Sequence, residues 1–118
     1  MLYSIMSFLR IRFYPEGGAG PVRDYLTDLA QARPAAYAKL ALDLETLGAE
    51  GLRSRRISLR PLGGGLWELK RRFEGTQYRV FLCVVRGAVW LLHGIEKKSA
   101  KTPKNALRLA QERMRRIS

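Results

Sequence analysis

The second half of the chain carries three runs of strand-forming residues separated by two short turn signals, and this spacing limits the possible folds more than any other feature. In the first run, Leu66–Phe73, apolar and charged side chains alternate, as they do in a strand with one buried face. Residues 77–85 and 88–95 are rich in Val, Leu and aromatic side chains. Glu74-Gly75-Thr76 and Arg86-Gly87 fit tight turns. We therefore predict a three-strand antiparallel meander whose second and third strands are central.

The first half of the chain predicts one strand and two helices. Residues 8–14 alternate apolar side chains with arginines, which is the pattern of a half-buried strand. A helix is predicted to begin at Pro21, because proline favours the first helical position and apolar residues follow at helical spacing. A second helix is predicted from Pro34 to Gly48. The short connection between the two indicates an antiparallel helical hairpin.

The remaining segments complete a predicted α+β fold. Residues 52–61 are interpreted as a basic connector. Gly63-Gly64-Gly65 is interpreted as a flexible loop, because it precedes a strand and lacks the Lys-Ser/Thr of a phosphate-binding P-loop. A last helix is predicted over Lys101–Arg116, with Thr102 as its N-cap and Pro103 next. The predicted order is thus an N-terminal strand, a helical hairpin, the three-strand meander and a C-terminal helix.

Length and composition predict one cytoplasmic domain. The 118 residues fit a single domain, residues 1–118, and 47% hydrophobic residues are enough for one core. The single cysteine, Cys83, lies in an apolar run and is predicted to be a buried structural thiol in a reducing compartment. Residues 1–9 make a poor signal peptide, and no run approaches the roughly 20 apolar residues of a membrane span. A membrane partner is therefore not expected.

The formal net charge of +12 comes from the second half of the chain. Residues 1–51 contain five basic and six acidic side chains, whereas residues 52–118 contain 17 basic and four acidic ones. A segment so biased either repels itself in water or faces a polyanion, so nucleic acid is the first partner to consider. An anionic membrane surface or an acidic protein would satisfy the same field, and charge alone leaves these alternatives open.

The predicted meander gathers cations on one face of the sheet. Lys70 and Arg72 share a face of the first strand, and the hairpin is expected to bring Arg72 and Arg79 within reach of one phosphate. His93, the only histidine, is predicted to end the third strand. Each of these residues also has a structural interpretation. Arg79, for example, would pair with Glu68 inside the sheet.

These residue types are suited to cutting RNA without a metal ion. The reaction needs a base for the 2′-hydroxyl, cations for the pentacoordinate phosphate and an acid for the leaving 5′-oxygen. Histidine, or a lysine with a lowered pKa, can transfer protons, and arginine stabilises negative charge. A basic sheet that only binds RNA would carry the same residues. The sequence indicates no cofactor and no metal-ligand cluster.

Four motifs in order resemble the HigB/RelE superfamily of bacterial type II toxins, particularly its phage-derived HigB-like branch. Members of this branch typically read Leu-Trp-Glu-Leu-Arg, then Tyr-Arg-Val, then Leu-His-Gly-Phe-Lys-Lys, then Lys-Thr-Pro. The corresponding segments here are Leu66–Lys70, Tyr78–Val80, Leu92–Lys98 and Lys101–Pro103. Two departures are a lysine at the end of the first motif and Ile95-Glu96 in place of the usual phenylalanine.

The resemblance implies a RelE/ParE-like fold and a toxin that cuts mRNA in the ribosomal A site by metal-independent attack of the 2′-hydroxyl. Carried over by position, Lys70 and Arg79 bind phosphate or stabilise the transition state, and His93 transfers a proton. Contacts with RNA are expected from four further cations, namely Arg72, Lys97, Lys98 and Lys101. The implied partners are mRNA, the ribosome and a cognate antitoxin, often of the helix-turn-helix type. Operator DNA would be bound mainly through the antitoxin.

Three functions are compatible with these observations. The first is a ribosome-dependent mRNA endoribonuclease, which requires Lys70, Arg79 and His93 to face one cleft. The second is a gyrase-targeting toxin of the same fold that does not cut RNA. The third is a non-catalytic nucleic-acid-binding co-regulator, whose affinity would depend steeply on salt.

Overall fold

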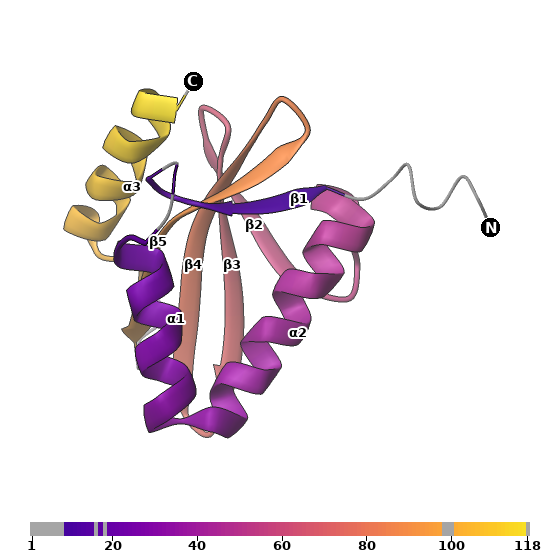
Figure 1. The fold of residues 1–118 in the computed structure, drawn as a ribbon, viewed down its shortest axis with the longest axis vertical. Coiled ribbons are helices and arrows are strands. Elements are labelled where there is room, and N and C mark those ends of the chain that lie inside the picture. The colour runs from indigo at the N-terminus through magenta and orange to yellow at the C-terminus, as the bar shows by residue number, and fades with distance from the viewer. Residues whose placement is uncertain (1–8, 16, 18, 98–100, 118) are drawn as a thin grey trace.

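The computed structural model describes residues 9–15, 17, 19–97 and 101–117, and within these residues the fold is α+β, as predicted (Figure 1). The helices are α1 (Pro21–Ala32), α2 (Pro34–Glu50) and α3 (Lys104–Ile117), with a 3-10 turn at Gly51–Arg53. The strands are β1 (Arg10–Phe13), β2 (Ser58–Gly63), β3 (Leu66–Phe73), β4 (Thr76–Val85) and β5 (Ala88–Lys97).

The five strands form one mixed sheet in the order β1-β5-β4-β3-β2. Strands β2 to β5 make an antiparallel meander, and β1 pairs in parallel with β5. Strands β4 and β5 are therefore interior strands, which confirms their predicted central place. Glu74-Gly75 and Arg86-Gly87 form the turns on either side of β4, and all four residues have positive φ. Such turns match the twist of the flanking strands.

The meander has four strands, one more than predicted. Residues 58–63 were expected in a connector and loop, but they form β2 and pair with β3. The strand was not predicted because it contains Pro61, and proline is rarely found inside a sheet. Pro61 is tolerated because β2 is an edge strand and the register shifts between Pro61 and Gly63. Gly63, Gly64 and Gly65 all have positive φ, so the glycine run closes a β2–β3 hairpin.

Helices cover both faces of the sheet, and the sheet separates the core into two clusters. On one face, α1 and α2 pack side by side over the strands, with Leu40, Leu47 and Leu69 fully buried between them (Figure 1). On the other face, α3 covers a cluster that includes Phe81 and Leu92. Each buried leucine contributes about 1.5–3 kcal/mol of stability. Every strand residue thus lies on either the α1–α2 face or the α3 face.

Two helix boundaries differ from the prediction. Helix α2 does not stop at Gly48 but continues to Glu50. Gly48 serves close packing instead, because a Cβ there would lie 3.2 Å from the carbonyl oxygen of Leu9, whose amide donates to the Gly48 carbonyl at 2.7 Å. Helix α3 begins at Lys104, and the carbonyl of Pro103 accepts its first hydrogen bond. Thr102 is therefore not the N-cap.

Cys83 is buried on the α3 face, as predicted. Burial raises the pKa of its thiol to about 11, so this sulfur is neutral at pH 7. Among the described residues, no helix has the length and apolar character needed to cross a bilayer.

Candidate functional site

The register of β3 and β4 places Lys70 directly opposite Arg79 on the α3 face. Directly opposite residues have Cβ atoms roughly 4.5–5.5 Å apart, so these two cations belong to one local site. Arg72 was predicted to lie beside Arg79, but it lies opposite Gln77. The reason is that the turn contains only Glu74-Gly75, since the next residue already belongs to β4.

The guanidinium of Arg79 is held inside the sheet by three side chains. Its Nη1 donates to Oε2 of Glu68 at 3.2 Å and to Oγ1 of Thr102 at 2.7 Å, and its Nη2 donates to Oε1 of Gln77 at 2.6 Å. Only 1% of the Arg79 surface and 3% of the Glu68 surface are exposed. The structural interpretation of Arg79, an ion pair with Glu68, is therefore confirmed. We call Glu68, Gln77, Arg79 and Thr102 the buried network.

Thr102 ties the buried network to the loop before α3. Its hydroxyl donates to Oε2 of Glu68 at 2.9 Å and accepts hydrogen bonds from Arg79 and from Nη2 of Arg60 at 3.1 Å. A hydroxyl has one donor and two acceptor positions, so these three contacts use its full capacity. Thr102 was predicted to cap α3, but its side chain instead binds side chains of the sheet.

Arg60, on the strand that the prediction missed, is the second arginine bound to Glu68. Its Nη2 donates to Oε1 of Glu68 at 3.0 Å, while 58% of its side chain is exposed. Arg60 lines a cavity of about 80 Å³ together with Ser58, Glu68, Lys70 and Arg79. Three cations and one carboxylate surround this cavity, which therefore carries excess positive charge. We call it the cation pocket.

A β-bulge brings His93 to the same face of the sheet. Phe81 pairs with His93, but Leu82 pairs with Leu91, so β5 contains one extra residue at this point. A bulge re-aims the side chains that follow it. The imidazole of His93 accordingly stacks on the Phe81 ring, with centroids 6.1 Å apart and planes inclined by 15°. His93 does not end the strand as predicted, because β5 continues to Lys97.

The environment of His93 favours its neutral form. Burial lowers the pKa of His93 below its ordinary value of 6.5, and the positive charge of Arg113 on α3 lowers it further. Arg113 is fixed there by a hydrogen bond from its Nη1 to the Leu92 carbonyl at 2.7 Å. A neutral imidazole at pH 7 can accept a proton but is a poor proton donor.

Gly94, the residue after His93, packs against α1 on the opposite face of the sheet. A Cβ on Gly94 would lie 2.6 Å from the ring of Tyr25, so glycine leaves the space that α1 needs to pack on β5. The hydroxyl of Tyr25 donates to the Ile95 carbonyl at 3.2 Å. The Leu-His-Gly motif therefore combines an imidazole on the α3 face with a contact for α1.

A family model described as phage derived protein Gp49-like (DUF891) matches residues 27–115, which is most of the chain. The chain belongs to the Gp49-like family. This family falls within the toxin-antitoxin-related RelE/HigB-like toxin group, so the predicted relationship to toxins is confirmed at that level. Membership in such a family also suggests an antitoxin partner. No curated protein and no solved structure gives a significant match to the chain.

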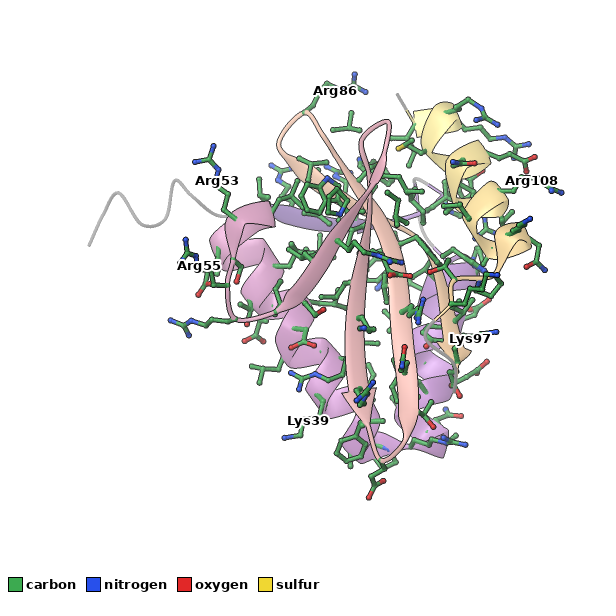
Figure 2. All side chains as sticks on the ribbon, turned by 180° about the vertical axis from the view of Figure 1, so that it is seen from behind. Lys39, Arg53, Arg55, Arg86, Lys97 and Arg108 are labelled. Atoms are coloured by element: carbon green, nitrogen blue, oxygen red, sulfur yellow. The ribbon has the colours of Figure 1, made fainter. Side chains whose placement is uncertain are left out.

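The predicted RNA-binding cations of this Gp49-like protein lie around the cation pocket rather than in it. Gln77 pairs with Arg72 on one side and Lys97 on the other, so these two cations lie across three strands on the α3 face. Lys97 is labelled in Figure 2. Lys101 is exposed in the loop before α3. Lys98 lies outside the described residues.

The sequence prediction did not assign four residues to the site, namely Ser58, Arg60, Gln77 and Thr102, and it named Glu68 only as a structural partner of Arg79. The signal for Arg60 was the alternation of Ile57 and Leu59 with polar neighbours just before the glycine run. Within the part of the chain that the structure describes, no three His, Cys, Asp or Glu side chains converge as a metal site requires.

Proposed function

We propose that this Gp49-like protein is the toxin of a type II toxin-antitoxin system, of the HigB kind, and that it inhibits translation by cutting mRNA on the ribosome without a metal ion. Family membership supports the toxin assignment. The endoribonuclease assignment is supported by the chemistry of the α3 face.

The cation pocket carries this proposal. Glu68 is bound by both Arg60 and Arg79, so its single negative charge is shared between two guanidinium groups. Lys70 adds a third positive charge to the same pocket. A site with this excess charge favours an anion, and arginine forks match the oxygen geometry of a phosphodiester.

The residues of the pocket would have different roles. Lys70 and the half-exposed Arg60 would contact the scissile phosphate and stabilise the extra charge of its pentacoordinate state. Arg79 is too deeply buried to contact RNA in this conformation. We assign it as a positioning residue, which holds Glu68 and thereby the guanidinium of Arg60.

His93 would act as the proton acceptor. It would take the proton of the 2′-hydroxyl, the 2′-oxygen would attack phosphorus, and the bond from phosphorus to the 5′-oxygen would break. That oxygen would take a proton from Lys70 or from water and leave as a hydroxyl. The products would be a 2′,3′-cyclic phosphate and a 5′-hydroxyl end. Proton transfer of this kind typically contributes about 10²–10⁴-fold to the rate.

The surrounding cations would hold the RNA backbone and attract the antitoxin. Arg72, Lys97 and Lys101, with Lys98, are the proposed backbone contacts. The same positive field would speed association with an acidic surface on the antitoxin. We propose an antitoxin of helix-turn-helix type that covers the α3 face and supplies most contacts with operator DNA.

One observation favours a second candidate function. Because Nη1 and Nη2 of Arg79 are held by three side chains of the buried network, the α3 face has the features of a stable basic platform. A platform of this kind would bind nucleic acid as a non-catalytic co-regulator. The two functions differ in one respect that can be measured, which is the appearance of cut RNA.

The test is transcriptome-wide mapping of RNA 5′ ends after brief induction in a bacterial host. The variants are Lys70→Gln and His93→Gln, and the matched control is Lys39→Gln, an exposed lysine on α2 far from the pocket (Figure 2). All proteins are compared at equal soluble expression. We expect new 5′-hydroxyl ends at fixed positions within codons for wild type and Lys39→Gln. We expect these ends to be lost in both Lys70→Gln and His93→Gln.

Other results would overturn the endoribonuclease assignment. Growth arrest without new ends would favour a gyrase-type target. Neither arrest nor new ends would favour the binding platform. New ends that persist in Lys70→Gln would mean that the cation pocket does not cut the RNA.

A further inference from the structure

A second basic cavity lies at the opposite end of α3 from the cation pocket. It has a volume of about 670 Å³ and lies between β1, the β4–β5 turn and the last turn of α3. This volume is typical of ligand-binding pockets. Four of its described lining residues are arginines, and none is acidic: Arg10, Arg12, Arg86 and Arg116. We call this cavity the arginine cradle.

Aromatic groups orient two of these arginines. The guanidinium of Arg12 lies over the ring of Trp90, 5.7 Å from its centroid. Nη1 of Arg116 donates to the hydroxyl of Tyr14 at 3.3 Å, and Arg113 lies over the Tyr14 ring at 5.4 Å. The Tyr14 hydroxyl orients the guanidinium of Arg116 and adds no negative charge beside it. A cation held in place before binding loses less entropy when a ligand arrives.

The β4–β5 turn forms part of the lining of the cradle. Arg86 is exposed at the tip of this hairpin, well apart from Lys97 at the other end of β5 (Figure 2). Arg116 is exposed on α3, where its hydrogen bond to Tyr14 raises its pKa. Glu112 raises this pKa further but does not line the cavity. The family match covers residues 27–115, so β1 and Arg116 lie outside it. Arg86 and Trp90, which also line the cavity, lie within the match.

We propose that the arginine cradle binds the phosphodiester backbone of single-stranded RNA. The cavity is concave and basic, and the planar fork of arginine pairs with two phosphate oxygens at once. Trp90 is only 7% exposed, so it supports Arg12 rather than stacking on a base. Recognition would thus read the backbone and not the sequence. The cradle would hold the RNA strand at a distance from the cation pocket, and so adds a second RNA contact to the proposed function. The choice of RNA as the ligand rests on that proposed function.

Two other anionic partners fit less well. A membrane surface favours a flat basic face with protruding apolar side chains, whereas this surface is hollow. An acidic peptide would present its carboxylates on separate flexible side chains, whose ordering costs entropy, whereas phosphates belong to the backbone of the strand. Both remain outcomes of the test.

The test measures binding of a short fluorescent RNA whose 2′-hydroxyls are methylated, so that cleavage plays no part. The cradle variant is Arg86→Gln with Arg116→Gln. The matched control is Arg53→Gln with Arg55→Gln, which removes the same charge from the segment after α2, on the other side of the molecule (Figure 2). Affinity is measured by anisotropy over a range of salt concentrations, and folding is checked by circular dichroism and thermal unfolding.

We expect the cradle variant to bind about 25-fold more weakly at ~0.1 M salt and its salt slope to fall by about 1.4, because each phosphate contact with a single strand contributes about 0.7 to that slope. The control should keep the wild-type slope. Equal losses in both variants would overturn the proposal in favour of a diffuse field, and no loss in the cradle variant would overturn it outright.

Two competitors identify the ligand. Polyglutamate or anionic lipid vesicles that displace the RNA from wild type, but not from the cradle variant, would overturn the assignment to RNA. Duplex DNA that shows the same loss as the RNA would overturn the assignment to a single strand. Failure to cut mRNA in cells would leave this binding result intact, so the two proposals fail separately.

Discussion

The arginines at the two ends of α3 differ in what holds their side chains. At the N-terminal end, Arg79 is buried and donates to Glu68, Gln77 and Thr102. At the C-terminal end, Arg116 is exposed and donates to the hydroxyl of Tyr14. The first arrangement compensates a charge inside the protein, whereas the second presents a charge at the surface.

This difference shows why a count of arginines does not locate a binding site. Compensation by a buried carboxylate makes Arg79 part of the framework, although its motif suggested a role in chemistry. In the cradle, Arg86 and Arg116 are exposed, and the hydroxyl of Tyr14 orients Arg116. Stability should therefore depend on the buried network, and anion affinity should depend on the cradle and on Lys70.

The largest effect is expected where the buried ion pair is broken. Glu68→Gln removes the carboxylate to which Arg79 and Arg60 donate, and leaves a buried positive charge with a weaker partner. We expect the free energy of unfolding to fall by about 3–5 kcal/mol, measured by urea denaturation. Glu112→Gln, an exposed acid on α3, is the control and should keep the wild-type value.

A double variant tests whether the charge itself causes that loss. Glu68→Met with Arg79→Met removes both charges, and we expect it to be more stable than Glu68→Gln, because two apolar side chains of similar size can replace a buried pair. A double variant less stable than Glu68→Gln would show that packing, not electrostatics, dominates at this end of α3.

A smaller loss is expected when the hydroxyl of the network is removed. Thr102→Val keeps the shape of the side chain but takes away its bonds to Glu68, Arg79 and Arg60. We expect a loss of about 1–3 kcal/mol in urea denaturation, since buried polar groups lose a partner. Thr102→Ser retains the hydroxyl and should recover most of the stability. Equal losses in both variants would assign the effect to the methyl group.

Sequence patterns predicted most of the fold because they are local. Alternation along residues 66–73, proline at the start of α1 and α2, and the glycine-containing turns around β4 all act within a few residues. Strand β2 escaped because Pro61 is rarely found inside a sheet, and only its place at the edge makes it acceptable. The position of β2 at the edge depends on how the whole sheet assembles, so the sequence of this segment alone does not reveal it.

The site was harder to predict because it depends on register. Shortening the expected turn by one residue moved Arg72 away from Arg79 and put Lys70 there instead. The bulge beside Leu82 put His93 on the α3 face, and no residue type marks that bulge in the sequence. Thr102 was noticed within its motif, but its contact with Glu68 joins residues 34 positions apart. Such a contact follows only from the assembled sheet.

A further prediction concerns the pH dependence of stability and tests His93, which is close to Arg113 of α3. Because burial and Arg113 lower the pKa of His93 in the folded state, the unfolded chain binds a proton more readily there, near pH 6.5. Stability contributed by this site is therefore complete above about pH 6.5 and is lost as the pH falls through the lower folded-state pKa. We expect wild type to lose more stability than His93→Gln between about pH 8 and about pH 5. Parallel pH profiles would mean that the imidazole titrates as it does in water.

The smallest effect on stability is expected in the arginine cradle. Arg86→Gln with Arg116→Gln alters two exposed side chains, and surface substitutions away from buried contacts rarely change stability. We expect its thermal midpoint to match that of the control, Arg53→Gln with Arg55→Gln, although RNA binding should fall in the cradle variant alone. A cradle variant that unfolds well below the control would show that the bond between Arg116 and Tyr14 is structural, as the bond between Arg79 and Glu68 is. Arg79 and Arg116 would then differ in exposure, but both would stabilise the fold.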